Sequence, residues 1–142
     1  MTTIGATWRC TAAGRGGPRE IHAGYELSAR RTSLLTDDEY VYFSSATTKS
    51  GEKAGIRRAK KTGGVTLLVP FEDSILRLAL VGPYLYFLST SSTLHRAPKA
   101  GGPAKRLPIQ GSQIRAFVVD GDSIYWTDQG SNRVLRASLA GL

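Results

Sequence analysis

The residues with the greatest potential for chemistry form a basic segment, residues 49–61, which could attract phosphate groups. Six of its thirteen positions are positively charged: Lys49, Lys53, Arg57, Arg58, Lys60 and Lys61. The chain of 142 residues is itself basic, with 19 lysines and arginines against 11 acidic residues and a net charge of +8. This balance is compatible with an anionic partner. The candidate binding surface therefore consists of Lys49, Lys53, Arg57 and Arg58.

A solvated surface is the simpler interpretation of the basic segment. Lys49 and Lys53 precede residues 55–59, which we predict to be a strand. Lys60 and Lys61 follow that strand. The two pairs of lysines would then lie at opposite ends of a sheet, too far apart to bind one phosphate backbone together. Binding of an anion or a nucleic acid is therefore the less favoured alternative.

Side chains suited to catalysis or metal binding are few. His22 and His95 are the two histidines, and no G-x-S-x-G motif surrounds a serine nucleophile. Cys10 is the single cysteine, which excludes an internal disulfide and a thiolate metal cage. Asp120 and Asp122 lack the further oxygen ligands of a calcium loop. The sequence predicts no enzymatic activity, no metal site and no cofactor.

The elements that must position these residues recur along the chain. Three tyrosines, Tyr42, Tyr86 and Tyr125, are spaced by 44 and 39 residues, and three arginines follow them at spacings of 38 and 40: Arg58, Arg96 and Arg136. A glycine turn comes shortly after each arginine. A period of about 40 residues built from short strands is typical of propeller blades, and no stretch shows a sustained helical period.

The predicted fold is all-β, a partial β-propeller of about three four-stranded antiparallel blades in one domain. We expect strands at 31–36, 39–43, 55–59 and 65–69, at 76–81, 84–88, 94–97 and 104–107, and at 114–119, 123–127 and 133–137. The units are a half-blade at 1–30 with the third and fourth strands of a preceding blade, blade 1 at 31–75, blade 2 at 76–113, and blade 3 at 114–142, which lacks its outer strand. About three blades should not close a ring, so the propeller is incomplete unless it is extended or oligomerised.

The aromatic side chains of the repeated strands are predicted to pack in the core. Tyr42, Tyr86 and Tyr125 each precede a Phe or Trp, and neighbouring residues of a strand face opposite sides of their sheet. Burial on both faces is expected where sheets are stacked on either side. An aromatic binding platform is the less favoured interpretation.

The stretch Ile124, Tyr125, Trp126, Thr127, Asp128, followed by Val134, Leu135, Arg136 and a small-residue turn, resembles the repeat of YWTD-type β-propellers and related bacterial repeats. The resemblance covers about residues 31–142 and is strongest in the third unit. It implies a structural role for Asp128, as a group that bonds between blades. Because Ser45 and Ser89 stand at the corresponding positions, it implies that blades 1 and 2 lack this contact.

We predict a non-enzymatic binding module whose partner is a protein, or a second copy of the chain that completes the ring. Residues 18–21 of another copy could supply the missing outer strand. Propeller lyases or lactonases are the alternative, but their central acids and histidines have few counterparts here beyond Glu72, Asp73 and His22. The N-terminus has no secretory signal pattern and no stretch is a membrane span, so we expect a cytoplasmic location.

The connection at residues 44–54 is about twice as long as its counterparts at 89–93 and 128–132. Long loops on a rigid scaffold often carry binding residues, but loops also tolerate insertions without function. The sequence leaves both interpretations open.

Overall fold

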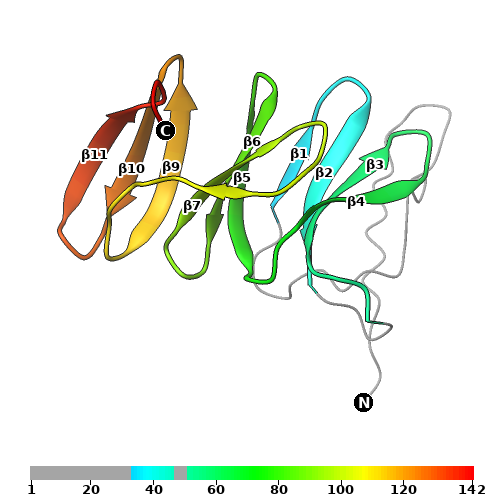
Figure 1. Ribbon diagram of the computed structural model, residues 1–142, viewed down its shortest axis with the longest axis horizontal. Coiled ribbons are helices and arrows are strands. Elements are labelled where there is room, and N and C mark those ends of the chain that lie inside the picture. Colours follow the sequence, from blue (N-terminus) through cyan, green and yellow to red (C-terminus); the bar gives the residue numbers. More distant parts are fainter. Residues whose placement is uncertain (1–32, 47–50) are drawn as a thin grey trace, which may run out of the picture.

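The computed structural model describes residues 33–46 and 51–142, and within these ranges the protein is all-β, with three antiparallel sheets and no helix (Figure 1). Sheet 1 contains β1 (Leu34–Thr36), β2 (Tyr40–Ser45), β3 (Gly55–Lys60) and β4 (Val65–Pro70). Sheet 2 contains β5 (Ile75–Val81), β6 (Tyr84–Ser89), β7 (Leu94–Pro98) and β8 (Lys105–Arg106). Sheet 3 contains β9 (Ile114–Asp120), β10 (Ser123–Asp128) and β11 (Arg133–Ser138). The all-β prediction is confirmed, whereas the half-blade expected at residues 1–30 lies outside the described residues.

Tight turns set the register of the sheets. In sheet 2, Val81 pairs with Tyr84 across a two-residue turn that begins with Gly82, whose φ is +56°. Sheet 3 has the same arrangement at Gly121, with a φ of +55°. Side chains with a Cβ atom rarely adopt these angles, which explains why glycine occupies both positions. We call the end of the sheets that carries these turns the upper end, and the opposite end the lower end.

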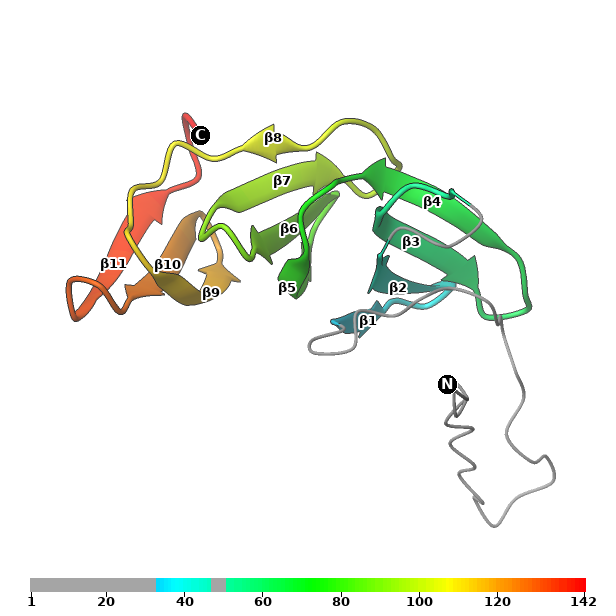
Figure 2. The same ribbon diagram turned by 90° about the horizontal axis from the view of Figure 1, so that it is seen from below.

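The three sheets stand side by side and form an arc (Figure 2). The first strands of neighbouring sheets lie against each other on the concave side, with β1 next to β5 and β5 next to β9. The last strands, β4, β8 and β11, lie on the convex side. Within the described residues, β4 and β8 complete four-stranded sheets, whereas β11 pairs with β10 alone.

Two hydrophobic clusters fill the space between the sheets, and β6 contributes to both. Leu85 and Phe87 point toward sheet 1, while Tyr86 and Leu88 point toward sheet 3. Each of these four side chains is at most 3% exposed, and burial of a large apolar side chain contributes on the order of 2 kcal/mol. The aromatic residues of the recurring strands, Tyr42 and Trp126 among them, thus pack mainly in the core.

Each sheet places a tyrosine of its second strand opposite an arginine of its third strand. The pairs are Tyr42 with Arg58, Tyr86 with Arg96, and Tyr125 with Arg136. In sheets 1 and 2 the guanidinium lies over a second tyrosine ring two residues earlier, at 4.4 Å from the Tyr40 ring centre and 4.6 Å from that of Tyr84. The spacing found in the sequence therefore corresponds to a cross-strand contact formed in all three sheets.

Sheet 3 forms this contact in a modified way. Ser123 replaces the second tyrosine, and its Oγ accepts hydrogen bonds from Nε and Nη2 of Arg136 at 3.0 and 2.9 Å. The same guanidinium lies 5.7 Å from the ring centre of Tyr125.

In the part of the chain that the structure describes, no helix could cross a bilayer.

Candidate binding surface

The basic segment does not form one cationic surface among its described residues. Lys53 precedes the start of β3 at the lower end, whereas Lys60, which pairs with Tyr40, and Lys61 lie at the upper end, where β3 turns into β4. This separation agrees with the sequence prediction. Lys49, the fourth residue of the predicted surface, lies outside the described residues.

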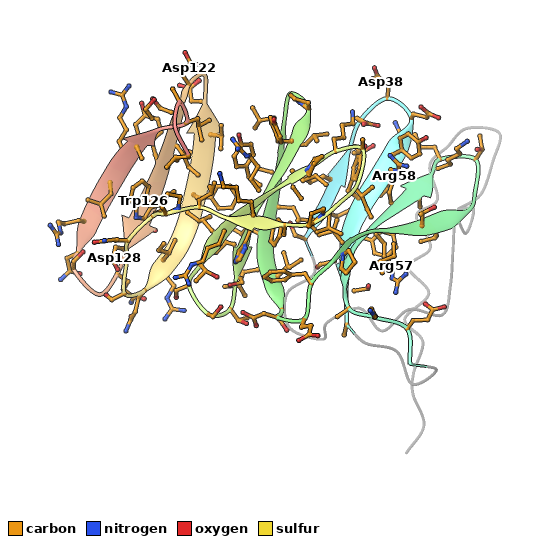
Figure 3. The ribbon with its side chains drawn as sticks, in the orientation of Figure 1. Asp38, Arg57, Arg58, Asp122, Trp126 and Asp128 are labelled. Atoms are coloured by element: carbon orange, nitrogen blue, oxygen red, sulfur yellow. The ribbon has the colours of Figure 1, made fainter. Side chains whose placement is uncertain are left out.

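Arg57 and Arg58 are consecutive residues of β3 and face opposite sides of sheet 1 (Figure 3). Arg57 is only 4% exposed. Its Nε donates to Ser45 Oγ at 2.8 Å, its Nη2 donates to the carbonyl of Lys53 at 2.8 Å, and the guanidinium lies 3.4 Å from Glu52. The positive charge of Arg57 is therefore engaged inside the protein. Part of the long connection before β3 folds back onto this arginine.

At the lower end of sheet 3, the carboxylate of Asp128 connects two loops. Its Oδ1 accepts hydrogen bonds from the backbone N–H groups of Gln113 at 2.9 Å and Gly130 at 3.2 Å, and from Ser112 Oγ at 3.3 Å. Its Oδ2 accepts from Ser131 Oγ at 2.7 Å. These bonds, with that of Ser131 the strongest, lower the pKa of Asp128 to about 2.

The resemblance implied that Asp128 bonds between blades. Its partners Ser112 and Gln113 lie in the connection that leads from β8 of sheet 2 into β9, and Ser131 lies in the turn between β10 and β11. The carboxylate therefore ties the connection between the two sheets to the corner of sheet 3.

Sheet 2 has an equivalent brace with the residue types exchanged. Register places Ser89 at the position of Asp128, because Ser89 pairs with Ile75 as Asp128 pairs with Ile114. Asp73, two residues before Ile75, is then the counterpart of Ser112. The strand position in sheet 2 thus carries a serine, as the sequence shows, and the carboxylate of this corner comes from the loop instead.

The carboxylate of Asp73 binds the turn between β6 and β7. Its Oδ2 accepts from the backbone N–H of Ser91 at 3.1 Å and from Ser91 Oγ at 2.6 Å, and its Oδ1 accepts from Thr90 Oγ1 and the N–H of Ser74. Burial raises the pKa of Asp73, but the hydrogen bonds from Ser91 and Thr90 outweigh this and lower it to about 2.

A chain of hydroxyl groups leads from Asp73 to His95, one of the two histidines of the chain. Ser91 Oγ lies 3.3 Å from Thr93 Oγ1, which lies 2.8 Å from Nε2 of His95. The imidazole stacks on the Phe87 ring at 5.2 Å, and burial followed by the charge of Arg106 lowers the pKa of His95. The imidazole of His95 is thus a partly buried packing group.

The upper end holds a further carboxylate contact that sequence reasoning missed. In the β1–β2 turn, Asp37 accepts from the N–H groups of Glu39 and Tyr40 and from the hydroxyl of Tyr42 at 2.8 Å. Its Oδ2 also forms an ion pair with Lys99 of sheet 2 at 2.5 Å. The Lys99 contact, followed by the Tyr40 N–H, lowers the pKa of Asp37, while burial and the Asp37 bond raise the pKa of Tyr42 to about 12.

The carboxylates described above are occupied by hydroxyl, N–H and lysine partners. Among residues 33–46 and 51–142, no three His, Cys, Asp or Glu side chains gather as metal ligands. A small pocket of about 80 Å³ opens at the lower end between Ser44 and Asp73. A larger groove of about 390 Å³ runs along sheet 3 beside Trp126 and Leu135.

No protein-family model and no curated protein matches the chain.

Proposed function

We propose that the chain is a partial β-propeller of about three blades that acts as a non-enzymatic interaction module, and that its partner is a second copy of itself. The side-by-side sheets, with their first strands adjacent on the concave side of an arc, support this architecture (Figure 2). In a propeller each blade packs between two neighbours. Sheet 2 is packed in this way, whereas sheets 1 and 3 each have one described neighbour.

The observation that carries the proposal is an uncovered apolar face on sheet 3. Val134 is 74% exposed, whereas Leu94 and Ile56, at the same position of sheets 2 and 1, are 1% and 0% exposed. Val118 is also 57% exposed, and with Tyr125 it borders a shallow apolar hollow of about 200 Å³. This face is built like those that the next sheet covers in the rest of the molecule. Exposed apolar faces of this kind mark interaction sites.

Sheet 1 exposes a leucine on the matching face at the other end of the row, although Arg57 of the same face is buried. Leu34 is 67% exposed, whereas Leu78, its counterpart in sheet 2, is 7% exposed and packs against sheet 1. Sheet 1 of one copy can therefore cover sheet 3 of another in the way that sheet 2 covers sheet 1. Two copies joined at both ends would give about six blades, which lies within the usual range for a closed ring.

The charge distribution favours this partner over an anion. Lys53 and Lys60 lie at opposite ends of β3, and Arg57 is buried against Glu52. A phosphate backbone needs several cations along one surface.

Light scattering on the purified chain over a range of concentrations tests the proposal. We expect a species of about twice the protomer mass of 15.3 kDa at micromolar concentration. Substitution of Val134 by aspartate should shift the equilibrium toward the protomer, while the same change at Thr66, which is exposed on β4, should not. A folded protomer at all concentrations would overturn the proposal.

A further inference from the structure

The outer edge of sheet 3 is an open strand with a groove beside it. In sheets 1 and 2, the third strand pairs with a fourth strand, β4 or β8. The corresponding edge of β11 has no paired strand among the described residues. A strand edge of this kind is a template for an added strand.

The groove is specific to sheet 3. In sheet 2 the equivalent space is filled, because Phe71 and His95 pack against the Phe87 ring at 4.9 and 5.2 Å. In sheet 3, Leu135 holds the position of His95, Ile109 lies in the connection before β9, and about 390 Å³ is open beside Trp126. The smaller aliphatic side chains leave room for one more apolar side chain.

The indole N–H of Trp126 also marks the groove as incomplete. Trp126 lines the groove and is 7% exposed, and its Nε1 is buried without a hydrogen-bond partner. A buried indole N–H normally donates to an acceptor. The backbone carbonyls of an extended segment lying in the groove are acceptors of the required kind.

Sheet 2 indicates which residues would face this edge. There, Arg106 of β8 lies opposite His95, and Lys105 lies opposite Arg96. Leu135 and Arg136 hold the equivalent positions on β11. The fourth strand of sheet 3 would therefore place one residue against Leu135 and its predecessor against Arg136.

One other stretch of the chain has the sequence that leads into β8. Gly101, Gly102 and Pro103 precede β8, and the same Gly-Gly-Pro triplet occurs at residues 16–18. When the two triplets are aligned, Glu20 takes the place of Lys105 and Ile21 takes the place of Arg106. Glu20 would then lie opposite Arg136, and Ile21 would lie beside Leu135 in the groove. The charges are opposite, and the apolar residue meets the apolar groove.

We propose that residues 18–21 of a second copy add to β11 as the fourth strand of sheet 3, with Ile21 in the groove and Glu20 paired with Arg136. The inference rests on the self-association proposed above and names the strand that completes it. A second copy is the source because the segment precedes sheet 1, and sheets 1 and 3 lie on opposite sides of sheet 2 (Figure 1).

Charge reversal in two separate chains tests the pairing. Glu20→Arg alone and Arg136→Glu alone each place like charges opposite each other and should weaken self-association by about tenfold. An equimolar mixture should restore it, because in the mixed dimer both interfaces pair Arg with Glu. The mixture also controls for folding, since a misfolded variant cannot be rescued by its partner. Sedimentation equilibrium of the full-length chains measures all three dissociation constants.

Ile21→Asp is a second, independent probe, because it removes the groove anchor without touching β11, and it should weaken association by more than tenfold. Arg77→Glu, on β5 of sheet 2 and away from both proposed contacts between copies, is the matched control and should leave association unchanged. If the wild-type chain dimerises but the three variants associate equally well, the strand assignment is overturned and the proposed function stands. If the variants weaken but mixing does not restore association, the pairing between copies is overturned. A wild-type protomer at all concentrations overturns both proposals.

Discussion

Sheets 2 and 3 each brace one corner with an aspartate, but the positions of aspartate and serine at that corner are exchanged. In sheet 3 an aspartate at the end of β10 accepts bonds from a loop serine, whereas in sheet 2 the aspartate is in the loop and the serine ends β6. In both sheets the carboxylate ties the connection before the first strand to the turn after the second. The comparison shows that the corner needs one carboxylate. Either the loop before the first strand or the end of the second strand can supply it.

The two sheets differ more in how they are covered. Sheet 2 is buried on both faces, and five of the six residues of β6 are buried. Sheet 3 is buried on one face and exposes Val118 and Val134 on the other. The first three predictions below test these two differences, and the fourth concerns the contact between sheets 1 and 2.

The largest expected effect compares Leu94→Ala with Val134→Ala, which change the same position in the covered and the uncovered sheet. Leu94→Ala should cost about 2–5 kcal/mol of unfolding free energy, because it leaves a cavity between sheets 2 and 3. Val134→Ala should cost less than about 0.5 kcal/mol in the protomer. Urea denaturation at low protein concentration measures both. A large cost for Val134→Ala that grows with concentration would show that a second copy covers this face.

The next effect concerns the exchanged carboxylates. Asp128→Ser should lower the thermal midpoint by several degrees, because the donors of four partly buried hydrogen bonds lose their carboxylate acceptor. Adding Ser112→Asp gives sheet 3 the arrangement of sheet 2 and should recover most of the loss. Differential scanning calorimetry of both single variants and the double variant tests this. Additive losses in the double variant would mean that the two corners are not interchangeable.

Acid should weaken both corners in the same pH range. Asp73 and Asp128 have folded-state pKa values of about 2, below the value of about 3.9 in an unfolded chain. Their contribution to stability is therefore complete above pH about 4 and is lost as the pH falls toward about 2. Melting temperatures measured between pH 6 and pH 2 should fall less steeply in Asp73→Ser than in the wild-type protein. If the two curves were parallel, the lowered pKa of Asp73 would not contribute to stability in this pH range.

The smallest effect is at the seam between sheets 1 and 2. Lys99→Met removes the ion pair with Asp37 and should cost less than about 1 kcal/mol, because the pair is partly exposed. The cost should shrink further in 0.5 M salt, since salt screens exposed charges. Denaturation at two salt concentrations measures this. An unchanged cost at high salt would mean that the lysine acts through packing.

The strands could be predicted from the sequence because two signals agree. Apolar runs in the recurring units end at glycine turns, and Gly82 and Gly121 indeed take left-handed angles at those turns. The predicted bounds differ from the observed ones by one or two residues in most strands. The fourth strand of sheet 2 was overestimated, and only Lys105–Arg106 pair there.

The site could be predicted less well, since its contacts join residues distant in sequence. Asp73 binds a turn 17 and 18 residues away, and Asp37 pairs with Lys99 of the next sheet. Nothing in the local sequence marks either residue as a hydrogen-bond hub. One available signal was the Asp–Ser exchange, which appears once Ser89 is aligned with Asp128 and Asp73 with Ser112.

The burial of β6 on both faces has a consequence for how the strand finds its pairing. In a half-buried strand, a slip of one residue moves polar side chains into the core, and this cost fixes the register. From Leu85 to Leu88 there is no polar face to misplace, so hydropathy gives little protection against a slip. The register must come instead from the tight turn at Gly82 and from the stacking of Arg96 on Tyr84. Lengthening that turn by one residue should therefore produce a chain that still collapses but pairs its strands in more than one way.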